Sequence, residues 1–329
     1  MRLRLIETVV TYASRDKLVL TRRGIALRYQ AKGDWESVSA MLLRGTTTRE
    51  LESLLPANEV ERLLQTVNTE GWLTTSSIAK TAPALDRQLG YLTMFDRDAG
   101  LAQSRISSGS VVILGVGGIG VVAVEHLVRA GIGSVTLIDF DKVEISNLNR
   151  HLLFSKADIG RSKIEAARDR LLQINPKLKV EIFDRFVNSI KDLQDVNLLP
   201  GDVLLIAIDR PRNIASELSD SIEQYGVKVM MGAVGLEKGF WGPFLVPGGH
   251  QLKCFEFEAS EVSLEWARTA EPTPWSFGPT NTVIGAQIAH DVIQHLVSNW
   301  CPSLEKRIFV DFKTNEITRV PMKRCSSHN

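Results

Sequence analysis

Residues 111–163 read VVILGVGGIGVVAVEHLVRAGIGSVTLIDFDKVEISNLNRHLLFSKADIGRSK, and this stretch decides the fold of the chain. It opens with the apolar run VVIL and turns at GVGGIG. Apolar residues then recur at helical spacing up to Gly131, and a second apolar run ends at Asp139. The order strand, glycine turn, helix and strand is half of a doubly wound nucleotide-binding sheet. We therefore predict an α/β fold built on a doubly wound, mostly parallel sheet.

The glycine turn is expected to bind phosphate. Its four glycines are Gly115, Gly117, Gly118 and Gly120. They let the backbone come close to a phosphate group and present N–H groups at the start of the helix. Asp139 follows about 20 residues later, where a carboxylate can accept hydrogen bonds from a pair of ribose hydroxyls. This fingerprint alone does not separate a nicotinamide enzyme, a flavoprotein and an ATP-using enzyme.

Polar side chains crowd into the segment directly after Asp139. They are Asp141, Asn147, Asn149, Arg150, Arg161 and Lys163. A redox dinucleotide has little use for several cations there, because its pyrophosphate already lies on the glycine turn. Three phosphoryl groups and a departing pyrophosphate do need fixed positive charge where negative charge builds up. The segment therefore favours ATP.

Two motifs in this segment carry a family resemblance. DFDKVEISNLNR at 139–150 and IGRSK at 159–163 resemble the motifs of the ThiF/MoeB/HesA family of ubiquitin-activating-like adenylyltransferases. The resemblance extends from about Asp86 to the C-terminus. It implies a Rossmann-like fold, with ATP and Mg²⁺ as cofactors.

The resemblance also implies roles for individual residues. Asp139 would hold the ribose of ATP, while Asn147 and Arg150 would hold its phosphates. Lys163 would contact the phosphates at the reacting end. Asp209, which closes the apolar run VLLIAID, would take the place of the magnesium-side aspartate of the family.

Two further positions are interpreted through the family pattern. The family usually has asparagine after the magnesium-side aspartate, and this chain has Arg210, which leaves the local hydrogen bonding open. Asp86-Arg87-Gln88 resembles the R-Q signature of the family, whose arginine reaches the nucleotide site of the partner subunit. A catalytic Arg87 would therefore imply a homodimer. Without the downstream motifs, a solvent-facing arginine on a helix would be the preferred interpretation of Arg87.

Length and composition set broad limits. A chain of 329 residues predicts about two domains, and 44% apolar with 23% charged residues is ordinary for a globular protein. The net charge of +1 argues against attraction to nucleic acid or to an anionic membrane. The N-terminus lacks the pattern of a signal peptide, and no apolar run reaches the ~20 residues of a membrane span. Three widely spaced cysteines fit a reducing cytoplasm.

Residues 1–76 are expected to form a winged-helix-like α+β domain. Three stretches of alternating apolar and polar residues predict strands, and three short helices follow. The domain resembles PqqD-like peptide-recognition domains, in which a leader peptide adds a strand to the sheet edge. DNA binding and a purely structural role are the alternatives. Glu59, Glu61 and Glu70 make the third helix a poor surface for DNA phosphates.

A linker is predicted at 77–85, and the adenylation domain at 86–329. Within that domain, residues 248–277 show no regular pattern. The family has a crossover loop over its substrate there, and a surface loop with a few buried anchors is an equal alternative. Thr280 and Asn281 are expected to cap the helix that follows.

The cysteines bear on two kinds of chemistry. Members of the family typically bind zinc through two C-x-x-C pairs, which this chain lacks. A His-Cys-Cys-His site from His250, Cys254, Cys325 and His328 is chemically conceivable, and loss of the zinc is the alternative. Cys301, before a proline at a helix end, is interpreted as a buried apolar residue and not as a thioester nucleophile.

The combined pattern indicates an ATP-dependent adenylyltransferase that activates a carboxylate on a ribosomally made precursor peptide. The arrangement is similar to that of the peptide-maturation branch of the family, which includes the microcin C adenylating enzyme and the pantocin A maturation enzyme. The precursor peptide would bind through the N-terminal domain. Activation of a ubiquitin-like or sulfur-carrier protein is the main alternative, and a DNA-binding regulator or a nicotinamide oxidoreductase is a more distant one.

Overall fold

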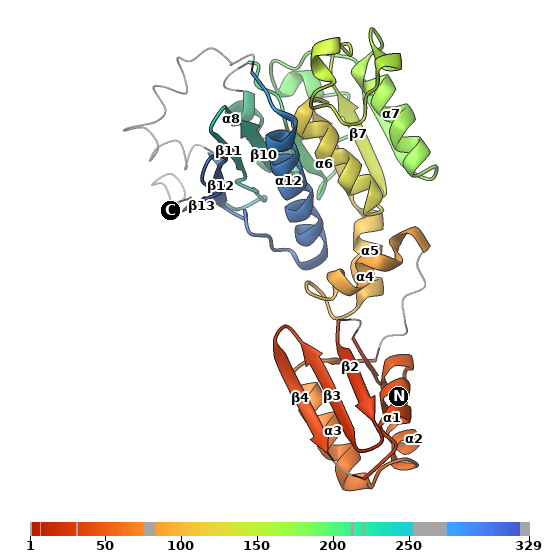
Figure 1. The fold of residues 1–329 in the computed structure, drawn as a ribbon. Coiled ribbons are helices and arrows are strands. Elements are labelled where there is room, and N and C mark those ends of the chain that lie inside the picture. The colour runs from red at the N-terminus through yellow and green to blue at the C-terminus, as the bar shows by residue number, and fades with distance from the viewer. Residues whose placement is uncertain are drawn as a thin grey trace. The chain divides into compact units, whose positions relative to one another are not determined.

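A computed structural model describes residues 2–6, 8–30, 32–75, 83–211, 214–219, 221–252 and 275–322. The chain divides into two compact units, Met1–Arg105 and Ile106–Asn329 (Figure 1). The domain boundaries predicted at 76 and 86 stay a prediction, and most of the predicted linker lies outside the described residues. None of the helices in the described ranges is both long and apolar enough to cross a bilayer.

The first unit is a small α+β structure. Its elements are β1 (Arg4–Leu5), β2 (Val10–Ser14), β3 (Lys17–Arg22), β4 (Ile25–Gln30), α1 (Trp35–Arg44), α2 (Thr48–Glu52), α3 (Ala57–Thr69), β5 (Leu73–Thr74), η1 (Pro83–Leu85) and α4 (Asp86–Leu92), with α5 (Ala99–Ser108) at the boundary. Strands β2, β3 and β4 form an antiparallel sheet, and β1 pairs with β5. The three predicted strands and three predicted helices are thus present. Buried Trp35 and Trp72 lie in the core of this unit together with leucines of β3 and α3.

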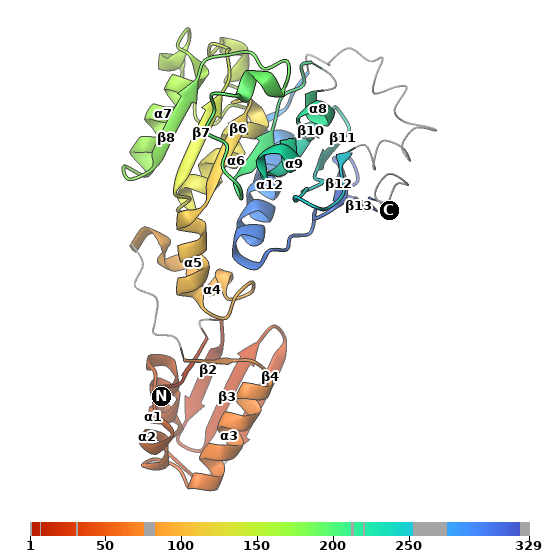
Figure 2. The same ribbon diagram turned by 180° about the vertical axis from the view of Figure 1, so that it is seen from behind.

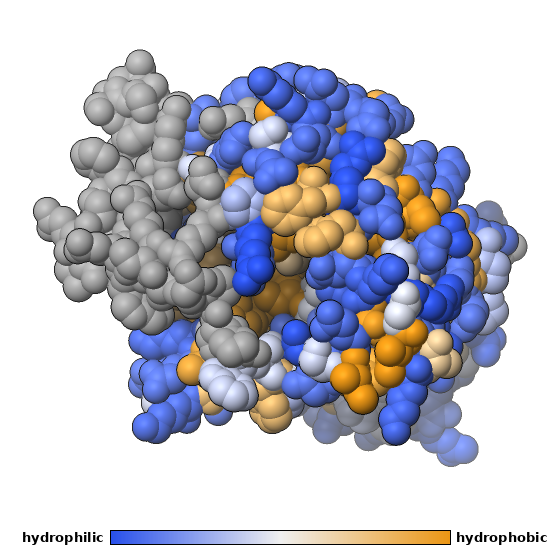
Figure 3. Space-filling model, turned by 90° about the horizontal axis from the view of Figure 1, so that it is seen from above, coloured by the Kyte–Doolittle hydropathy of each residue, from blue (hydrophilic) through white to orange (hydrophobic). Residues whose placement is uncertain are grey.

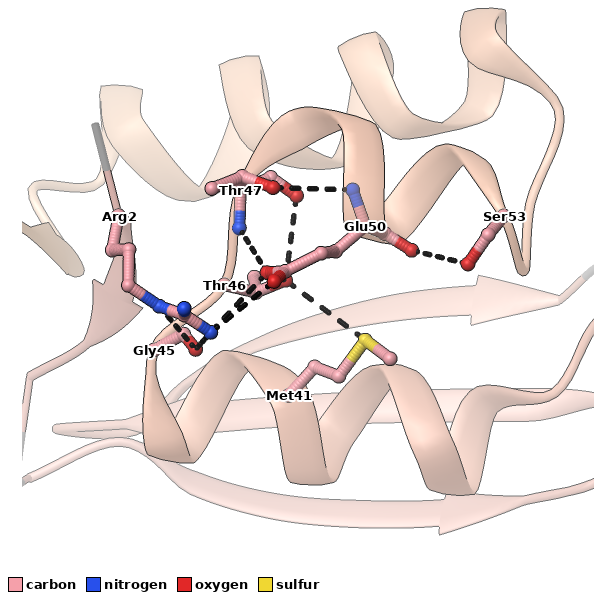
Figure 4. Close-up of polar contacts among 7 residues, drawn as sticks. All are labelled: Arg2, Met41, Gly45, Thr46, Thr47, Glu50 and Ser53. Carbon is pink, nitrogen blue, oxygen red and sulfur yellow. Dashed lines mark hydrogen bonds and ion pairs between the residues drawn. The ribbon is translucent and has the colours of Figure 1, made fainter.

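The junction between α1 and α2 is fixed by a capping box (Figure 4). Thr47 Oγ1 accepts a hydrogen bond from the amide of Glu50 at 3.2 Å, and Glu50 Oε2 accepts one from the amide of Thr47 at 2.8 Å. Arg2 reaches the same carboxylate and also donates to the carbonyl of Gly45 at 3.1 Å. These bonds satisfy amides at the start of α2 and hold the beginning of the chain against the junction.

The second unit is built on an eight-stranded sheet. Its elements are β6 (Ser110–Leu114), α6 (Gly118–Arg129), β7 (Ser134–Ile138), η2 (Ile145–Asn147), η3 (Lys156–Asp158), α7 (Lys163–Ile174), β8 (Lys179–Phe183), η4 (Ile190–Leu193), β9 (Val203–Ile206), α8 (Ile214–Ser219), α9 (Ser221–Tyr225), β10 (Lys228–Val234), β11 (Lys238–Trp241), α12 (Gly278–Ser298), β12 (Lys306–Asp311) and β13 (Ile317–Pro321). The strand order is β13-β12-β11-β10-β9-β6-β7-β8. The five strands from β10 to β8 are parallel, and β11, β12 and β13 extend the sheet in antiparallel fashion.

Helices cover both faces of this sheet (Figures 1 and 2). Helices α6, α7 and α12 bury their apolar residues on one face, and α8 lies over the other. The parallel strands are apolar throughout, as expected for strands that are buried on both faces. The prediction of a doubly wound, mostly parallel sheet preceded by a small α+β unit is confirmed.

The strand order locates the switch point of the sheet. From β6 the chain moves outward through β7 to β8, and it then returns to place β9 on the other side of β6. In open α/β sheets, ligands bind at the carboxyl ends of the strands where the order reverses. A ligand site is therefore expected at the carboxyl ends of β6 and β9.

One local prediction was wrong. Helix α12 begins at Gly278 with Phe277 as its N-cap residue, so Thr280 and Asn281 lie inside its first turn. Both side chains donate hydrogen bonds back to the carbonyl of Phe277, at 2.9 Å and 2.8 Å respectively. Both side chains thus bond to the carbonyl of Phe277, and the start of α12 has no side-chain cap.

Candidate functional site

In the glycine turn after β6, the backbone at Gly115 and Gly120 lies close to other backbone segments. Gly115 has φ +97°, and a Cβ at this position would lie 2.5 Å from the carbonyl oxygen of Ala207. A Cβ on Gly120 would collide with the carbonyl oxygen of Gly115. Only glycine fits at these two positions, because the turn must pass between β9 and the first turn of α6.

Gly117 and the start of α6 leave room for a ligand. A Cβ on Gly117 would meet no atom within 4 Å, so the space beside this residue is open. Helix α6 begins here without a side-chain cap, which leaves its first amides available to an anion. An open space next to uncapped amides is the arrangement that a phosphate group requires.

Arg150 and Asn281 lie beside the same turn. A Cβ on Gly118 would collide with Asn281 Oδ1 and would lie 3.4 Å from Arg150 Cδ. Arg150 Nη1 donates to the carbonyl of Ser146 and to Asn149 Oδ1, both at 2.9 Å. The site therefore has a cation next to the first turn of α6, as the phosphate role predicted for Arg150 requires.

Asp139 holds the end of β7 against the glycine turn. Its Oδ2 accepts a hydrogen bond from the amide of Val116 at 2.7 Å, and its Oδ1 accepts one from the amide of Asp141 at 2.8 Å. Burial raises the pKa of this carboxyl group, and the charge of Lys163 opposes that shift. Among the described residues each oxygen accepts only this one hydrogen bond, so the ribose role predicted for Asp139 fits this geometry and stays a prediction.

Lys163 is the buried cation of the site. Its side chain is 8% exposed, and its Nζ lies 2.7 Å from Asp141 Oδ2. The backbone reinforces this contact, because the amide of Lys163 donates to the carbonyl of Asp141 at 3.0 Å. The lysine at the start of α7 is thus held at the end of β7 before any substrate arrives.

Asn147 shapes the loop that carries Arg150. Its Oδ1 accepts a hydrogen bond from the amide of Glu144 at 3.0 Å, and its carbonyl accepts one from the amide of Arg150, also at 3.0 Å. The structure therefore shows Asn147 in a supporting position, and the phosphate contact predicted for it stays a prediction.

A cavity of about 240 Å³ lies at the carboxyl ends of β6, β7 and β9. Its lining includes Asp139, Asp141, Arg185, Phe186, Asp209 and Arg210. The view from above shows a hollow with hydrophobic residues inside it and with both hydrophilic and hydrophobic residues along its described rim (Figure 3). The cavity lies at the switch point of the sheet, so the carboxylates predicted from the sequence share one pocket.

Two aromatic rings border this cavity. Phe140 and Phe186 pack edge to face, with their ring centroids 4.9 Å apart, and both remain exposed. Arg185, beside Phe186, is held by two hydrogen bonds to Asp195, at 2.6 and 2.7 Å. Arg185, Phe186 and Asn281 were not predicted as site residues, because each comes from a segment without a motif and reaches the site only through the fold.

The donor set fits ATP and Mg²⁺. Uncapped amides and two cations suit the phosphates, while carboxylates and apolar rings at the cavity suit a nucleoside. In the described ranges, no group of three or more His, Cys, Asp or Glu side chains could hold a metal by itself. Mg²⁺ often uses only one or two carboxylates together with substrate phosphates, so Asp209 at the cavity remains a suitable ligand.

His151 is an uncharged neighbour of the two cations. It is buried, and its Nδ1 has no hydrogen-bond partner in the part of the chain that the structure describes. Burial, followed by the charges of Lys163 and Arg150, lowers its pKa to about 3. The imidazole is therefore neutral near pH 7 and adds no charge to the site.

Several predicted residues are not brought to this site. Arg87 is exposed on α4 in the first unit, so its role in a partner's site and the homodimer stay predictions. The amide of His250 donates to Glu305 Oε1 at 3.2 Å, whereas Cys254, Cys325 and His328 lie outside the described residues, so the zinc site is untested. Cys301 is buried, and burial raises the pKa of its thiol to about 12, which suits the predicted apolar role.

A comparison with known families decides the assignment. Residues 85–329 match the model of the ThiF family. The chain belongs to the ThiF family. This membership confirms the resemblance drawn from the motifs at 139–150 and 159–163, and with it the enzyme class, an ATP-dependent adenylyltransferase.

Individual relatives of this ThiF-family chain differ in how much they share with it. The molybdopterin-synthase adenylyltransferase of Escherichia coli is 29% identical over 242 residues, which are 73% of this chain and 92% of that enzyme. The ubiquitin-like modifier-activating enzyme 5 of Caenorhabditis elegans is 45% identical over 97 residues. The latter match spans only 26% of this chain and 23% of the longer relative, so it concerns one part of a ThiF-type domain.

The fold is shared with a solved enzyme along the whole chain. The structure of the microcin C7 biosynthetic enzyme MccB in complex with N-formylated MccA is 24% identical, covers 100% of both chains and superimposes with a TM-score of 0.80. The structure of E. coli MccB with ATP also gives a TM-score of 0.80 and covers 99% of this chain. These likenesses establish the same fold for both units of this ThiF-family chain.

Proposed function

We propose that this protein uses ATP to adenylate a carboxylate of a ribosomally made precursor peptide, as a step in the maturation of a peptide antibiotic or a related natural product. The likeness to MccB over the full length carries the proposal, since MccB has been solved with ATP and with N-formylated MccA. That likeness includes the small first unit, whereas the match to the molybdopterin enzyme takes in 73% of the chain.

The proposed chemistry needs position and charge, and no side-chain nucleophile. A carboxylate oxygen of the peptide attacks the α-phosphorus of ATP, the bond to the pyrophosphate breaks, and an acyl adenylate and pyrophosphate form. Negative charge on the departing pyrophosphate is stabilised by the amides at the start of α6 and by Arg150 beside Gly118. Lys163, which Asp141 already orients, adds the second positive charge. Mg²⁺ bound by Asp209 would neutralise part of the phosphate charge.

The first unit offers an edge to which a peptide could add a strand. Because the sheet order among the described residues is β2-β3-β4, strand β2 is an edge strand, and edge strands offer backbone groups for pairing. Its exposed face carries Val10 and Tyr12, which are 51% and 63% exposed. We propose that the precursor peptide pairs with this edge and covers these two side chains, which is a common mode of peptide recognition.

The proposal is tested with short peptides encoded next to the gene. The purified protein is incubated with ATP, Mg²⁺ and each peptide, and pyrophosphate exchange and peptide mass are measured. We expect exchange that depends on one peptide, and a mass change that corresponds to gain of a nucleotide or loss of water. An ATP titration that shows no binding would overturn the proposal, as would binding of NAD in its place.

Activation of a ubiquitin-like or sulfur-carrier protein is the second candidate. It is favoured by the identity to the E. coli molybdopterin enzyme and to the activating enzyme of C. elegans. A carrier protein that ends in Gly-Gly would then stimulate exchange, and no short peptide would do so.

A further inference from the structure

A second cavity lies entirely within the first unit. It has a volume of about 180 Å³ and is lined by the turn between β3 and β4, the end of α3 and residues 93–97. We propose that it is a subsite for the carboxylate side chain of an acidic residue in the bound peptide. This inference rests on the proposed function, because it presumes that the first unit binds a peptide.

Three arginines line the cavity: Arg22, Arg23 and Arg97. Arg22 is fixed by two hydrogen bonds, from its Nε to Thr8 Oγ1 at 2.8 Å and from its Nη2 to the carbonyl of Thr93 at 3.2 Å. Neutral oxygens thus orient this guanidinium group without cancelling its charge.

The other two arginines are positioned by local backbone geometry. Arg23 has φ +51° in the turn between β3 and β4, and its Nη2 lies 3.5 Å from the carbonyl oxygen of Met94. Gly71 has φ +67°, and a Cβ there would lie 2.6 Å from Nη2 of Arg97. A side chain at position 71 would therefore displace the guanidinium group of Arg97, and glycine leaves it in place.

Positive charge exceeds negative charge at this cavity. Two carboxylates also line it, Glu70 and Asp96, and Asp96 is already paired with Arg105 at 2.8 Å. None of the ion pairs found among the described residues joins any of the three lining arginines to a carboxylate. Burial lowers the pKa of Arg22, and the charges of Arg23 and Arg97 lower it further, as expected where like charges crowd together.

The chemistry of the cavity selects a carboxylate. A guanidinium group presents parallel N–H donors that match the two oxygens of a carboxylate, and Arg23 and Arg97 are exposed at the cavity and can turn toward a ligand. In an unmodified peptide, carboxylates are the groups that carry negative charge. An aspartate or glutamate side chain would balance the excess positive charge and fix the register of the peptide on the first unit.

The test uses the full-length protein and a fluorescein-labelled hexaglutamate peptide, with binding followed by fluorescence anisotropy at low salt. We expect hexaglutamate to bind, and Arg23→Gln and Arg97→Gln each to weaken that binding about five- to tenfold. Arg49→Gln is the matched control, because Arg49 is an exposed arginine on α2 that does not line the cavity. The control should bind hexaglutamate as the parent does, and a hexaglutamine peptide should not compete.

Two outcomes would overturn the subsite: no binding of hexaglutamate, or equal weakening by Arg49→Gln. Pyrophosphate exchange and thermal unfolding are measured on the same preparations. If pyrophosphate exchange is absent while hexaglutamate still binds in an arginine-dependent way, the result counts against the proposed function alone. Normal exchange with a natural peptide, without any hexaglutamate binding, counts against the subsite alone.

Discussion

Lys163 shows how much the site depends on single charges. Its ammonium group is buried, an unusual environment for lysine, and Asp141 is its ion-pair partner. Replacing Lys163 with alanine should lower pyrophosphate exchange by about 10²–10³-fold, the scale of one pre-organised electrostatic contact. Lys156→Ala, which removes an exposed lysine from η3 nearby in the chain, should keep the parental rate.

Arg150 supports a parallel prediction from a different contact. Its side chain lies against Gly118, where the first amides of α6 are open to an anion. Arg150→Ala should reduce exchange by about 10²–10³-fold and leave peptide binding by the first unit nearly unchanged. Arg170→Ala, at an exposed position of α7, serves as the control. Full exchange activity in the Arg150 variant would refute the assignment.

His151 links the site to the pH dependence of stability. Its pKa is lowered to about 3 in the folded protein, against 6.5 for an unperturbed histidine, and burial lowers the pKa of His295 to about 4. At a pH between the folded and the unfolded pKa of either histidine, the unfolded chain binds more protons than the folded one. The free energy of unfolding must therefore fall as the pH drops below about 6.5. Each histidine should contribute on the order of 1.4 kcal/mol per pH unit.

Urea unfolding at several pH values between 4.5 and 7.5 would measure this effect. His151→Gln should make the decrease shallower, since one proton-binding difference is removed. His126→Gln, which changes an exposed histidine of α6, is the matched control. An unchanged slope in the His151 variant would show that this side chain is already protonated, or accessible, in the folded state.

At the scale of elements, the glycine turn offers two substitutions with opposite expectations. Gly117 has φ −90° and open space around it, so Gly117→Ala should fold normally and place a methyl group where phosphate is expected. We expect unchanged thermal unfolding and ATP binding weakened about tenfold. Gly120→Ala would drive its Cβ into the carbonyl of Gly115 and should cost about 1–3 kcal/mol of stability. Equal ATP affinity in parent and Gly117→Ala would place the phosphates elsewhere.

Sequence patterns predicted the elements well where periodicity was strong. The run VVIL, the glycine turn and the apolar spacing up to Gly131 appear as β6 and α6, at almost the predicted positions. The start of α12 was harder to predict, because Thr280 and Asn281 are good capping residues by type and yet bond backward to Phe277. Capping preferences describe which residues suit a helix start, and the path of the preceding chain decides where that start falls.

At the scale of the molecule, single mutations should separate the binding functions proposed for the two units. Tyr12→Ser on the exposed face of β2 should weaken peptide binding and leave ATP affinity unchanged, because the cavity proposed for ATP, at the carboxyl ends of β6, β7 and β9, is lined wholly by the second unit. Leu43→Ser, which changes another exposed apolar residue of the first unit, is the control. Isothermal titration with ATP and with peptide would measure both affinities. Peptide affinity equal to the parent's in Tyr12→Ser would exclude the β2 edge.

Only those residues of the candidate site that come from one continuous segment could be predicted from the sequence. Asp139, Asn147, Arg150 and Lys163 fall within 25 consecutive residues, so their types and spacing indicated a triphosphate before any fold was known. Asn281 comes from a distant helix, and the arginine cavity joins a turn between strands to the segment after α4. Such groupings depend on tertiary packing, which carries no local pattern along the chain.

The two backbone hydrogen bonds of Asp139 affect how mutants at this position should be interpreted. By accepting hydrogen bonds from the amides of Val116 and Asp141 at once, this carboxylate works as a clamp that holds the segment after β7 against the glycine turn after β6. An Asp139→Asn variant would point an amide N–H at a backbone N–H, so the clamp would open and the cradle around the phosphates would shift. Lost activity in such a variant could therefore come from a distorted glycine turn as readily as from a missing contact to the ribose. A melting temperature equal to that of the parent would separate the two, because it would show that the turn is intact.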